Sequence, residues 1–190
     1  MFTLKNKYFL IIKSIKDIDL KNIKIRNKFS IIYRNQSNVE SKVHLLRFRR
    51  NCKIKSIKFY VANNIELAID LRSDGIYLSA FNKSLKALSF KKNNLKIIGS
   101  AHNLKEIWMK TKQGCDLILY SKLFLVSYDN KAPYLGVIKF NNFLKINKNL
   151  IPLGGINLNN LNSLKYVNSD GFALMSEAKK KPAKIFSRLF

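Results

Sequence analysis

A glycine pair followed by polar residues is the feature of this 190-residue sequence most typical of a binding site. Gly154 and Gly155 directly follow the apolar run 150–153, and Ser176 follows the apolar run 171–175. Two glycines let the backbone approach an anion closely, and a helix that begins after them offers free N–H groups. A tight turn that needs glycine only for its own conformation is the alternative. We expect a phosphate to bind between these glycines and Ser176.

One histidine is placed where it could move a proton. His102 comes just after the apolar run 96–100, which ends in Ser100. Imidazole titrates near neutral pH, so a histidine at the end of a strand is a candidate general base. The alternative is a residue of the first helical turn without a chemical role. The second histidine, His44, falls in the middle of a predicted helix, and we expect it to be structural.

Carboxylates are scarce at the positions where chemistry is expected. Asp74 and Asp170 each precede a glycine at the start of an apolar run, which places them at the opposite ends of the predicted strands. Only Asp129 and Glu177 lie near the C-terminal ends of such runs. A magnesium site needs carboxylate ligands, and paired acid–base chemistry needs two carboxyl groups. The sequence therefore offers no evident set of residues for either.

The elements that must position these residues alternate with a short period. Eight apolar runs rich in β-branched and aromatic residues predict strands, at Tyr8–Ile12, Phe29–Tyr33, Lys58–Ala62, Gly75–Ser79, Lys96–Ser100, Leu117–Tyr120, Leu150–Leu153 and Gly171–Met175. Helices are predicted after them, at Asp17–Arg26, Glu40–Lys53, Ile65–Arg72, Lys83–Lys92, Leu104–Lys112, Phe140–Ile146, Leu158–Val167 and Ala178–Leu189. This alternation is typical of parallel βαβ units, and eight such units close into a (β/α)8 barrel.

The predicted fold class is therefore α/β, a compact (β/α)8 TIM barrel that forms one domain over residues 1–190. Each unit averages about 24 residues, just below the usual size for this fold, so an open doubly wound sheet is the alternative. In a barrel the C-terminal ends of all strands meet at one mouth, where active sites lie. The long irregular connection 123–135 opens at this mouth and is predicted to act as a lid.

The composition excludes several classes of protein. The chain carries 36 Lys+Arg and 11 Asp+Glu, a formal net charge of +25, but Lys outnumbers Arg 29 to 7 and both halves are basic. Nucleic-acid sites favour arginine, so we expect solvated helix faces at 47–55 and 179–181 and no nucleic-acid partner. No apolar run reaches the roughly 18–20 residues of a membrane span, and the run 8–12 is too short for a signal peptide. Cys52 and Cys115 are expected to be core residues. We expect a cytoplasmic protein without a membrane partner.

The predicted strand ends, taken in order, resemble those of thiamine-phosphate synthases and the related TenI-like thiazole tautomerases. The motifs that carry the resemblance are DGIYL at 74–78, IGSAH at 98–102, GCD at 114–116, LGGI at 153–156 and GFA at 171–173. The resemblance implies a compact (β/α)8 barrel. It also implies an enzyme that joins an aminopyrimidine diphosphate to a thiazole phosphate with Mg²⁺ and releases diphosphate.

The residues that match the diphosphate half of the family's site are only partly kept. Arg34 and Asn63 match an arginine and an asparagine that contact the substrate, but Gln36 replaces a lysine. Asn64 and Asn82 stand where the family has its two magnesium-binding aspartates. An amide coordinates Mg²⁺ far more weakly than a carboxylate does. We therefore expect no tight metal site and at most weak Mg²⁺ binding.

The thiazole-phosphate half of the site is kept better. Gly154, Gly155 and Ser176 match the family's phosphate cradle, and Ser100 matches its strand serine. The family's loop lysine has no aligned partner, although Lys131 lies two positions beyond it. With His102, Ser100 and Lys131 form the set of candidate catalytic residues.

Two functions of different classes remain open. The first is a divergent transferase of thiamine biosynthesis that uses both phosphorylated substrates. The second is a barrel that binds a phosphorylated heterocycle, either as a TenI-like tautomerase with His102 as its base or as a binding protein. Family resemblance favours the first, whereas Asn64 and Asn82 favour the second. A basic RNA-binding protein is an outlying third.

Overall fold

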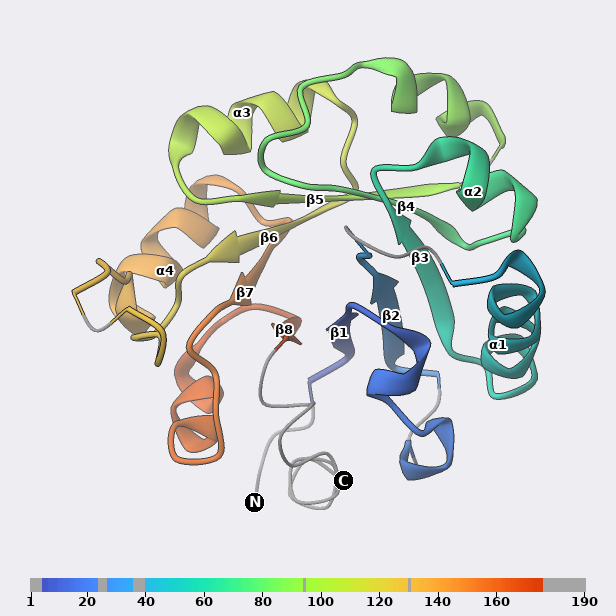
Figure 1. The fold of residues 1–190 in the computed structure, drawn as a ribbon. Helices are drawn as coiled ribbons and strands as arrows, with labels where there is room; N and C mark the ends of the chain where they lie inside the picture. Colours follow the sequence, from blue (N-terminus) through green and yellow to red (C-terminus); the bar gives the residue numbers. More distant parts are fainter. Residues whose placement is uncertain (1–4, 24–26, 36–39, 94, 130, 176–190) are drawn as a thin grey trace.

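The structure is a closed barrel of eight parallel strands (Figure 1). The computed structural model describes residues 5–23, 27–35, 40–93, 95–129 and 131–175. The strands are β1 Lys7–Ile12, β2 Phe29–Tyr33, β3 Lys58–Ala62, β4 Gly75–Leu78, β5 Lys96–Ala101, β6 Leu117–Ser121, β7 Leu150–Leu153 and β8 Gly171–Leu174. The predicted barrel is confirmed, and the alternative prediction of an open doubly wound sheet is wrong.

Each strand pairs with its neighbour in chain order, and the last strand returns to the first. Strand β8 pairs with β1 from Lys7↔Gly171 to Leu10↔Leu174. The seam between β7 and β8 is the shortest, with the single pair Leu153↔Ala173. A closed barrel leaves no unpaired sheet edge. Because all eight strands run parallel, their C-terminal ends lie at the same mouth.

The crossovers between the strands ring the outside of the barrel (Figure 1). Four are α-helices: α1 Lys42–Ile54, α2 Ile65–Asp70, α3 Leu104–Lys112 and α4 Gly136–Ile146. The others hold short 3₁₀ segments: η1 Ile15–Asp17, η2 Leu20–Asn22, η3 Lys86–Asn93 and η4 Leu161–Tyr166. None of the helices in the described ranges has the length and apolar character needed to cross a membrane.

The helix predicted over Asp17–Arg26 is wrong within the described residues. Ser14 and Asp17 form a capping box around η1, and the Asp19 side chain accepts a hydrogen bond from the Lys21 N–H at 2.9 Å. Short acidic and hydroxyl side chains that bond the nearby backbone favour turns over continuous helix. The segments predicted at Lys83–Lys92 and Leu158–Val167 form 3₁₀ helix, and Ala178–Leu189 lies outside the described residues.

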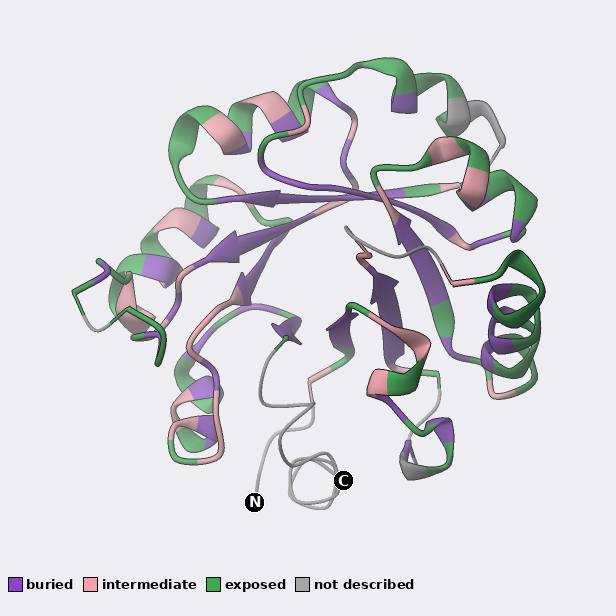
Figure 2. Ribbon diagram, viewed as in Figure 1, coloured by how far each residue is buried: buried purple, intermediate pink, exposed green. Residues whose placement is uncertain are grey.

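Apolar side chains form two separate layers, one inside the barrel and one between the strands and the helices. Figure 2 shows the strands buried along most of their length. The inner layer consists of Phe9, Ile11, Ile32, Tyr60, Tyr77, Ile98, Leu119, Ile151 and Ala173. The strands are therefore buried on both faces, which explains their nearly continuous apolar runs. Cys52 and Cys115 are buried and unpaired, as predicted.

Aspartates secure the end of the barrel opposite the mouth. The Asp74 carboxylate accepts from the Phe59 N–H at 2.7 Å, and Asp116 accepts from the Ile97 N–H at 2.8 Å. The guanidinium of Arg49 lies 3.2 Å from a carboxylate oxygen of Asp74, and most of the Arg49 side chain is buried. Both carboxylates therefore stabilise the end of the barrel opposite the mouth, as the position of Asp74 before a strand predicted.

Candidate functional site

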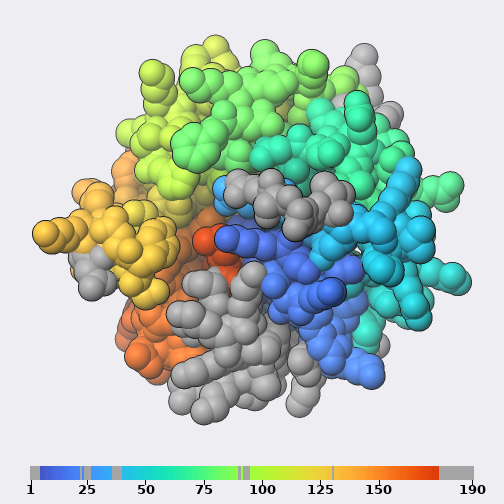
Figure 3. All heavy atoms as spheres, in the orientation of Figure 1, coloured from blue at the N-terminus to red at the C-terminus, as the bar shows by residue number. Residues whose placement is uncertain are grey.

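A cavity of about 260 Å³ opens at the mouth, where the strand C-terminal ends meet. We call it the mouth cavity. It is lined by Arg34, Tyr77, Ala80, Phe81, Ser100, His102, Ser121, Lys122, Leu125, Val126, Ser127, Tyr128, Leu153, Gly154, Gly155, Ile156, Asn157, Ala173, Leu174 and Met175. This end of the barrel faces the viewer in Figure 3, with the gold segment that follows β6 at its left edge.

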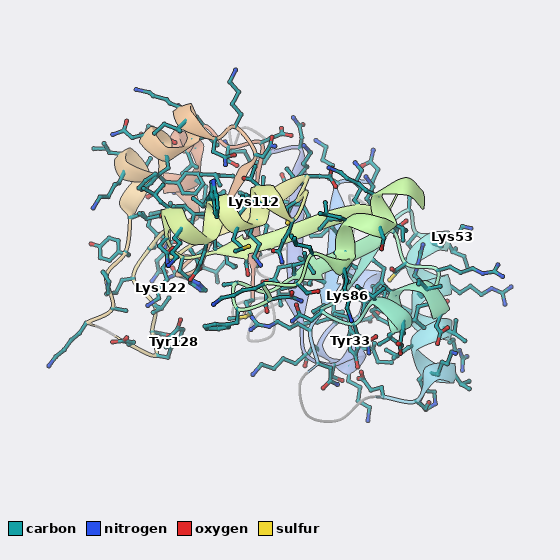
Figure 4. The ribbon with its side chains drawn as sticks, turned by 90° about the horizontal axis from the view of Figure 1, so that it is seen from above. Tyr33, Lys53, Lys86, Lys112, Lys122 and Tyr128 are labelled. Carbon is teal, nitrogen blue, oxygen red and sulfur yellow. The ribbon has the colours of Figure 1, made fainter. Side chains whose placement is uncertain are left out.

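The charged side chains that line the mouth cavity are cationic or basic. Arg34, Lys122 and His102 contribute to it, and no described Asp or Glu does. Within the described ranges, neither Arg34 nor Lys122 forms an ion pair with a carboxylate. Figure 4 shows Lys122 and Tyr128 on the same side of the barrel. A concave surface with uncompensated positive charge favours an anionic ligand.

The glycine pair forms one wall of this cavity. Gly154 and Gly155 both have positive φ, +91° and +72°, which favours glycine. The N–H groups of Gly155 and Ile156 donate no hydrogen bond within the described part of the chain. Oriented backbone N–H groups without partners are typical of a phosphate cradle.

Gly155 is also required for packing. A Cβ atom there would lie 2.2 Å from the Phe124 carbonyl oxygen and 2.6 Å from that of Leu125. The Gly155 carbonyl in turn accepts from the Asn160 amide at 2.8 Å. The glycine therefore lets the β6–α4 loop close against the cradle, so the loop and the candidate phosphate site are one structural unit.

Two hydroxyls stand on the floor of the cavity. Tyr77, in the inner layer of the barrel, forms a side-chain hydrogen bond with Ser100. Burial raises the pKa of the Tyr77 phenol, and the hydrogen bond with Ser100 and the charge of Arg34 offset only part of that rise. The phenol therefore stays protonated at neutral pH and can donate a hydrogen bond to a ligand.

His102 is held by a carboxylate. Its Nδ1 atom lies 3.0 Å from Oε2 of Glu106, and its backbone N–H donates to the same oxygen at 2.7 Å. Partial burial alone would raise the pKa of Glu106, but these contacts outweigh it and lower that pKa below its ordinary value. A carboxylate at Nδ1 favours a proton there, which leaves Nε2 as the basic atom.

The predicted metal positions lie outside the mouth cavity. Asn63, Asn64 and Asn82 line a separate side groove of about 400 Å³, together with Glu66 and Ser84. Asn64 caps α2 by accepting from the Leu67 N–H at 2.9 Å, and Asn82 accepts from the Ser84 N–H at 2.9 Å.

The side-chain oxygens of Asn64 and Asn82 thus both accept hydrogen bonds from backbone N–H groups. In addition, the Asn82 amide donates to Oδ1 of Asn63 at 3.1 Å. The described residues hold no group of three or more His, Cys, Asp or Glu side chains that could bind a metal ion. Two neutral, engaged amides do not fit a site for Mg²⁺, which prefers carboxylate oxygens.

The structure brings together five of the predicted site residues. Arg34, Ser100, His102, Gly154 and Gly155 all line the mouth cavity. The remaining ones are placed elsewhere: Asn63, Asn64 and Asn82 line the side groove, Lys131 is exposed and does not line the cavity, and Gln36 and Ser176 lie outside the described residues.

Sequence reasoning missed the roles of Tyr77 and Glu106. Glu106 follows the helix cap Asn103 by three residues, which is the spacing of a capping box, and it follows His102 by four. That spacing could have revealed the hydrogen-bonded pair of His102 and Glu106. Tyr77 lies within an apolar strand, and only the inward direction of alternate residues could have placed it in the barrel.

Comparisons with known proteins agree with this geometry. The sequence model of a family described as thiamine monophosphate synthase matches residues 6–178. A thiamine-phosphate synthase of Clostridioides difficile is 27% identical over 146 residues, which cover 75% of this chain and 69% of that protein. One of Prochlorococcus marinus subsp. pastoris is 32% identical over 63% of this chain, which spans only 35% of its length.

A solved structure shares the fold. The thiamine phosphate pyrophosphorylase of Pyrococcus furiosus superposes with a TM-score of 0.70 at 18% identity, and the match covers 98% of each chain.

Proposed function

The chain belongs to the thiamine monophosphate synthase family, and we propose that it joins an aminopyrimidine diphosphate to a thiazole phosphate and releases diphosphate. The observation that carries this proposal is the mouth cavity, which Arg34 and Lys122 line without a described carboxylate. Both substrates are anionic, so both fit a cavity of this charge.

Two sets of lining residues suit the two anionic groups of the substrates. The N–H groups of Gly155 and Ile156, which donate no hydrogen bond within the described residues, support binding of the thiazole phosphate. Ser176 is proposed as a further ligand. Arg34, Lys122 and Ser100 support binding of the diphosphate, and Gln36 is proposed to flank it. Asn63 lines the side groove and is proposed to act only through the loop 79–82, by accepting a hydrogen bond from the Ser79 N–H at 3.0 Å. As the diphosphate leaves, negative charge collects on its oxygens, and cations fixed beside it lower the barrier. Lys131 is proposed to add its charge from the loop.

Magnesium is not given a step in this reaction. Asn64 and Asn82 engage the backbone and carry no charge, so they do not fit the ion that the family uses. The transfer that we propose therefore relies on the chain's own cations, and Mg²⁺ binds weakly at most. We place the reaction in the cytoplasm, as expected for a biosynthetic enzyme, with no role for nucleic acid.

One observation favours the second function, a TenI-like thiazole tautomerase. The hydrogen-bonded pair of His102 and Glu106 lies at the cavity and presents a basic Nε2 atom. Such a pair is suited to moving a proton on a bound heterocycle. A barrel that only binds the phosphorylated heterocycle would need no such base.

A steady-state assay of thiamine phosphate formation from the two phosphorylated substrates tests the proposal. Product formed by the wild type and lost in Arg34→Met supports the transferase. Absence of product, together with His102-dependent tautomerisation of a thiazole phosphate, would replace it by the second function.

A further inference from the structure

A fully buried lysine contacts the loop 79–84, whose residues Ala80 and Phe81 line the mouth cavity. Lys110 comes from α3 and has no exposed surface. Its Nζ atom donates to the carbonyl oxygens of Ser79 and Asn82, both at 2.7 Å, and to the side chain of Gln113 at 2.8 Å. No carboxylate of the described residues forms an ion pair with it. A buried cation without an anionic partner is costly, so its presence calls for a reason.

Neighbouring residues provide both space and a hydrogen-bond partner for this lysine. At Gly99 of β5 a Cβ atom would lie 2.9 Å from the Cγ and Cδ atoms of Lys110, so the glycine provides the space for its stem. Gln113, also fully buried, donates to the carbonyls of Asn82 at 3.0 Å and Ser84 at 2.8 Å. Lys110 of α3 and Gln113, the residue that caps the C-terminus of this helix, thus hold the loop 79–84 through its carbonyl oxygens.

This arrangement orients the loop's amide hydrogens. The turn 79–82 is closed by the Asn82 N–H, which donates to the Ser79 carbonyl at 3.0 Å. That carbonyl also faces Lys110, and in a trans peptide the following N–H points the opposite way. This N–H belongs to Ala80, which lines the mouth cavity and donates no hydrogen bond within the described ranges.

We infer that Lys110 is a positioning residue that, through the carbonyls of Ser79 and Asn82, turns the 79–82 loop into a site for the diphosphate group without a divalent metal ion. The inference rests on the proposed function, which supplies a diphosphate substrate. Lys110 does not touch the ligand. It acts by fixing the Ala80 N–H and by adding a positive charge in a region of low dielectric, where charge acts strongly.

The test uses the full chain and inorganic pyrophosphate, titrated by calorimetry in EDTA and again with Mg²⁺. Lys110→Met removes the buried charge. Lys112→Met is the matched control, because Lys112 lies on the same helix but is exposed over the Trp108 ring. We expect the wild type and Lys112→Met to bind pyrophosphate in EDTA with similar affinity, and Lys110→Met to bind roughly tenfold more weakly.

The variant Lys110→Gln distinguishes the effect of the charge from the effect of the hydrogen bonds. It also replaces Lys110→Met in the test if that variant does not fold. It keeps a donor for the carbonyls but carries no charge. We expect it to regain thermal stability and part of the pyrophosphate affinity, because it restores the carbonyl contacts but not the charge. A merely structural lysine would leave the pyrophosphate affinity of the folded variants at the wild-type value, and that result would overturn the inference.

Two further results would also overturn it: pyrophosphate binding by the wild type that requires Mg²⁺, and equal losses in Lys110→Met and Lys112→Met. The proposed function is tested separately by product formation. Lys110-dependent pyrophosphate binding without thiamine phosphate synthesis would leave the inference standing and remove the function.

Discussion

Nδ1 of His102 lies 3.0 Å from Oε2 of Glu106, and the same oxygen accepts the backbone N–H of His102 at 2.7 Å. One carboxylate therefore fixes both the start of α3 and the ring of a residue that lines the mouth cavity. The contact ties the stability of the helix to the protonation of the candidate base.

This contact predicts a pH-dependent stability difference for Glu106→Gln. The pKa of Glu106 is lowered in the folded state, so its ionised form stabilises the fold. This contribution is complete above the ordinary value of 4.5 and is lost as the pH falls through the lowered pKa. We expect wild type and variant to differ by about 1 kcal/mol in unfolding free energy at neutral pH and to converge as the pH falls through the lowered pKa of Glu106.

Chemical denaturation across this pH range measures the difference. Glu66→Gln, at an exposed position in the first turn of α2, is the control and should have a smaller effect. A difference for Glu106→Gln that persists unchanged in acid would contradict the role of its charge.

Arg34→Met should weaken anion binding without a comparable loss of stability. Arg34 lines the mouth cavity and pairs with no described carboxylate, so its charge is available to a ligand. We expect the affinity for inorganic pyrophosphate to fall about tenfold by calorimetry. Arg50→Met, on the exposed face of α1, carries the same charge change and should leave the affinity unaltered. Equal effects of the two variants would show that only the net charge matters.

Gly155→Ala should damage the phosphate cradle through the neighbouring loop. Its Cβ would lie 2.2 Å from the Phe124 carbonyl oxygen, so the loop must move. Gly136→Ala is the matched control, since Gly136 also has positive φ, +69°, but has no atom within 4 Å of the added Cβ. We expect Gly136→Ala to cost about 1 kcal/mol of stability and to keep phosphate affinity, whereas Gly155→Ala loses both stability and affinity. Retained phosphate binding in Gly155→Ala would count against a cradle at this place.

The double variant Asn64→Asp, Asn82→Asp should acquire a magnesium site. Aspartate can still cap α2 at position 64, so the fold is expected to persist. With Glu66, the side groove would then hold three carboxylates, the ligands that Mg²⁺ prefers. Calorimetry with Mg²⁺ should show tight binding by the double variant and at most weak binding by the wild type. Tight Mg²⁺ binding by the wild type would contradict the prediction that Asn64 and Asn82 stand in place of a lost magnesium site.

The sequence predicted the barrel well because a parallel strand buried on both faces leaves a continuous apolar run. Strands β2, β3 and β7 were predicted to the residue. The crossovers were harder, because a 3₁₀ segment such as η4 shares the apolar spacing of an α-helix and differs only through local side-chain bonds. Asn157, for example, accepts from the Asn159 N–H at 2.9 Å just before η4.

The site was predictable only in part, for a related reason. Strand ends must converge in a closed barrel, so Arg34, Ser100 and His102 could be expected at one mouth. Position along the chain does not show which way a side chain points. The family resemblance identified Asn64 and Asn82 as altered metal positions but could not show that their oxygens bond the backbone, and the predicted helix over Leu104–Lys112 could not show that Lys110 is fully buried.

The most direct test of the account is the steady-state rate of thiamine phosphate formation by the wild-type chain, measured in EDTA and in excess Mg²⁺. The account predicts product under both conditions, with rates that agree within about twofold, because the chain's own cations stabilise the leaving diphosphate. A rate that is abolished by EDTA and restored by Mg²⁺ would contradict it and would identify an ordinary metal-dependent synthase.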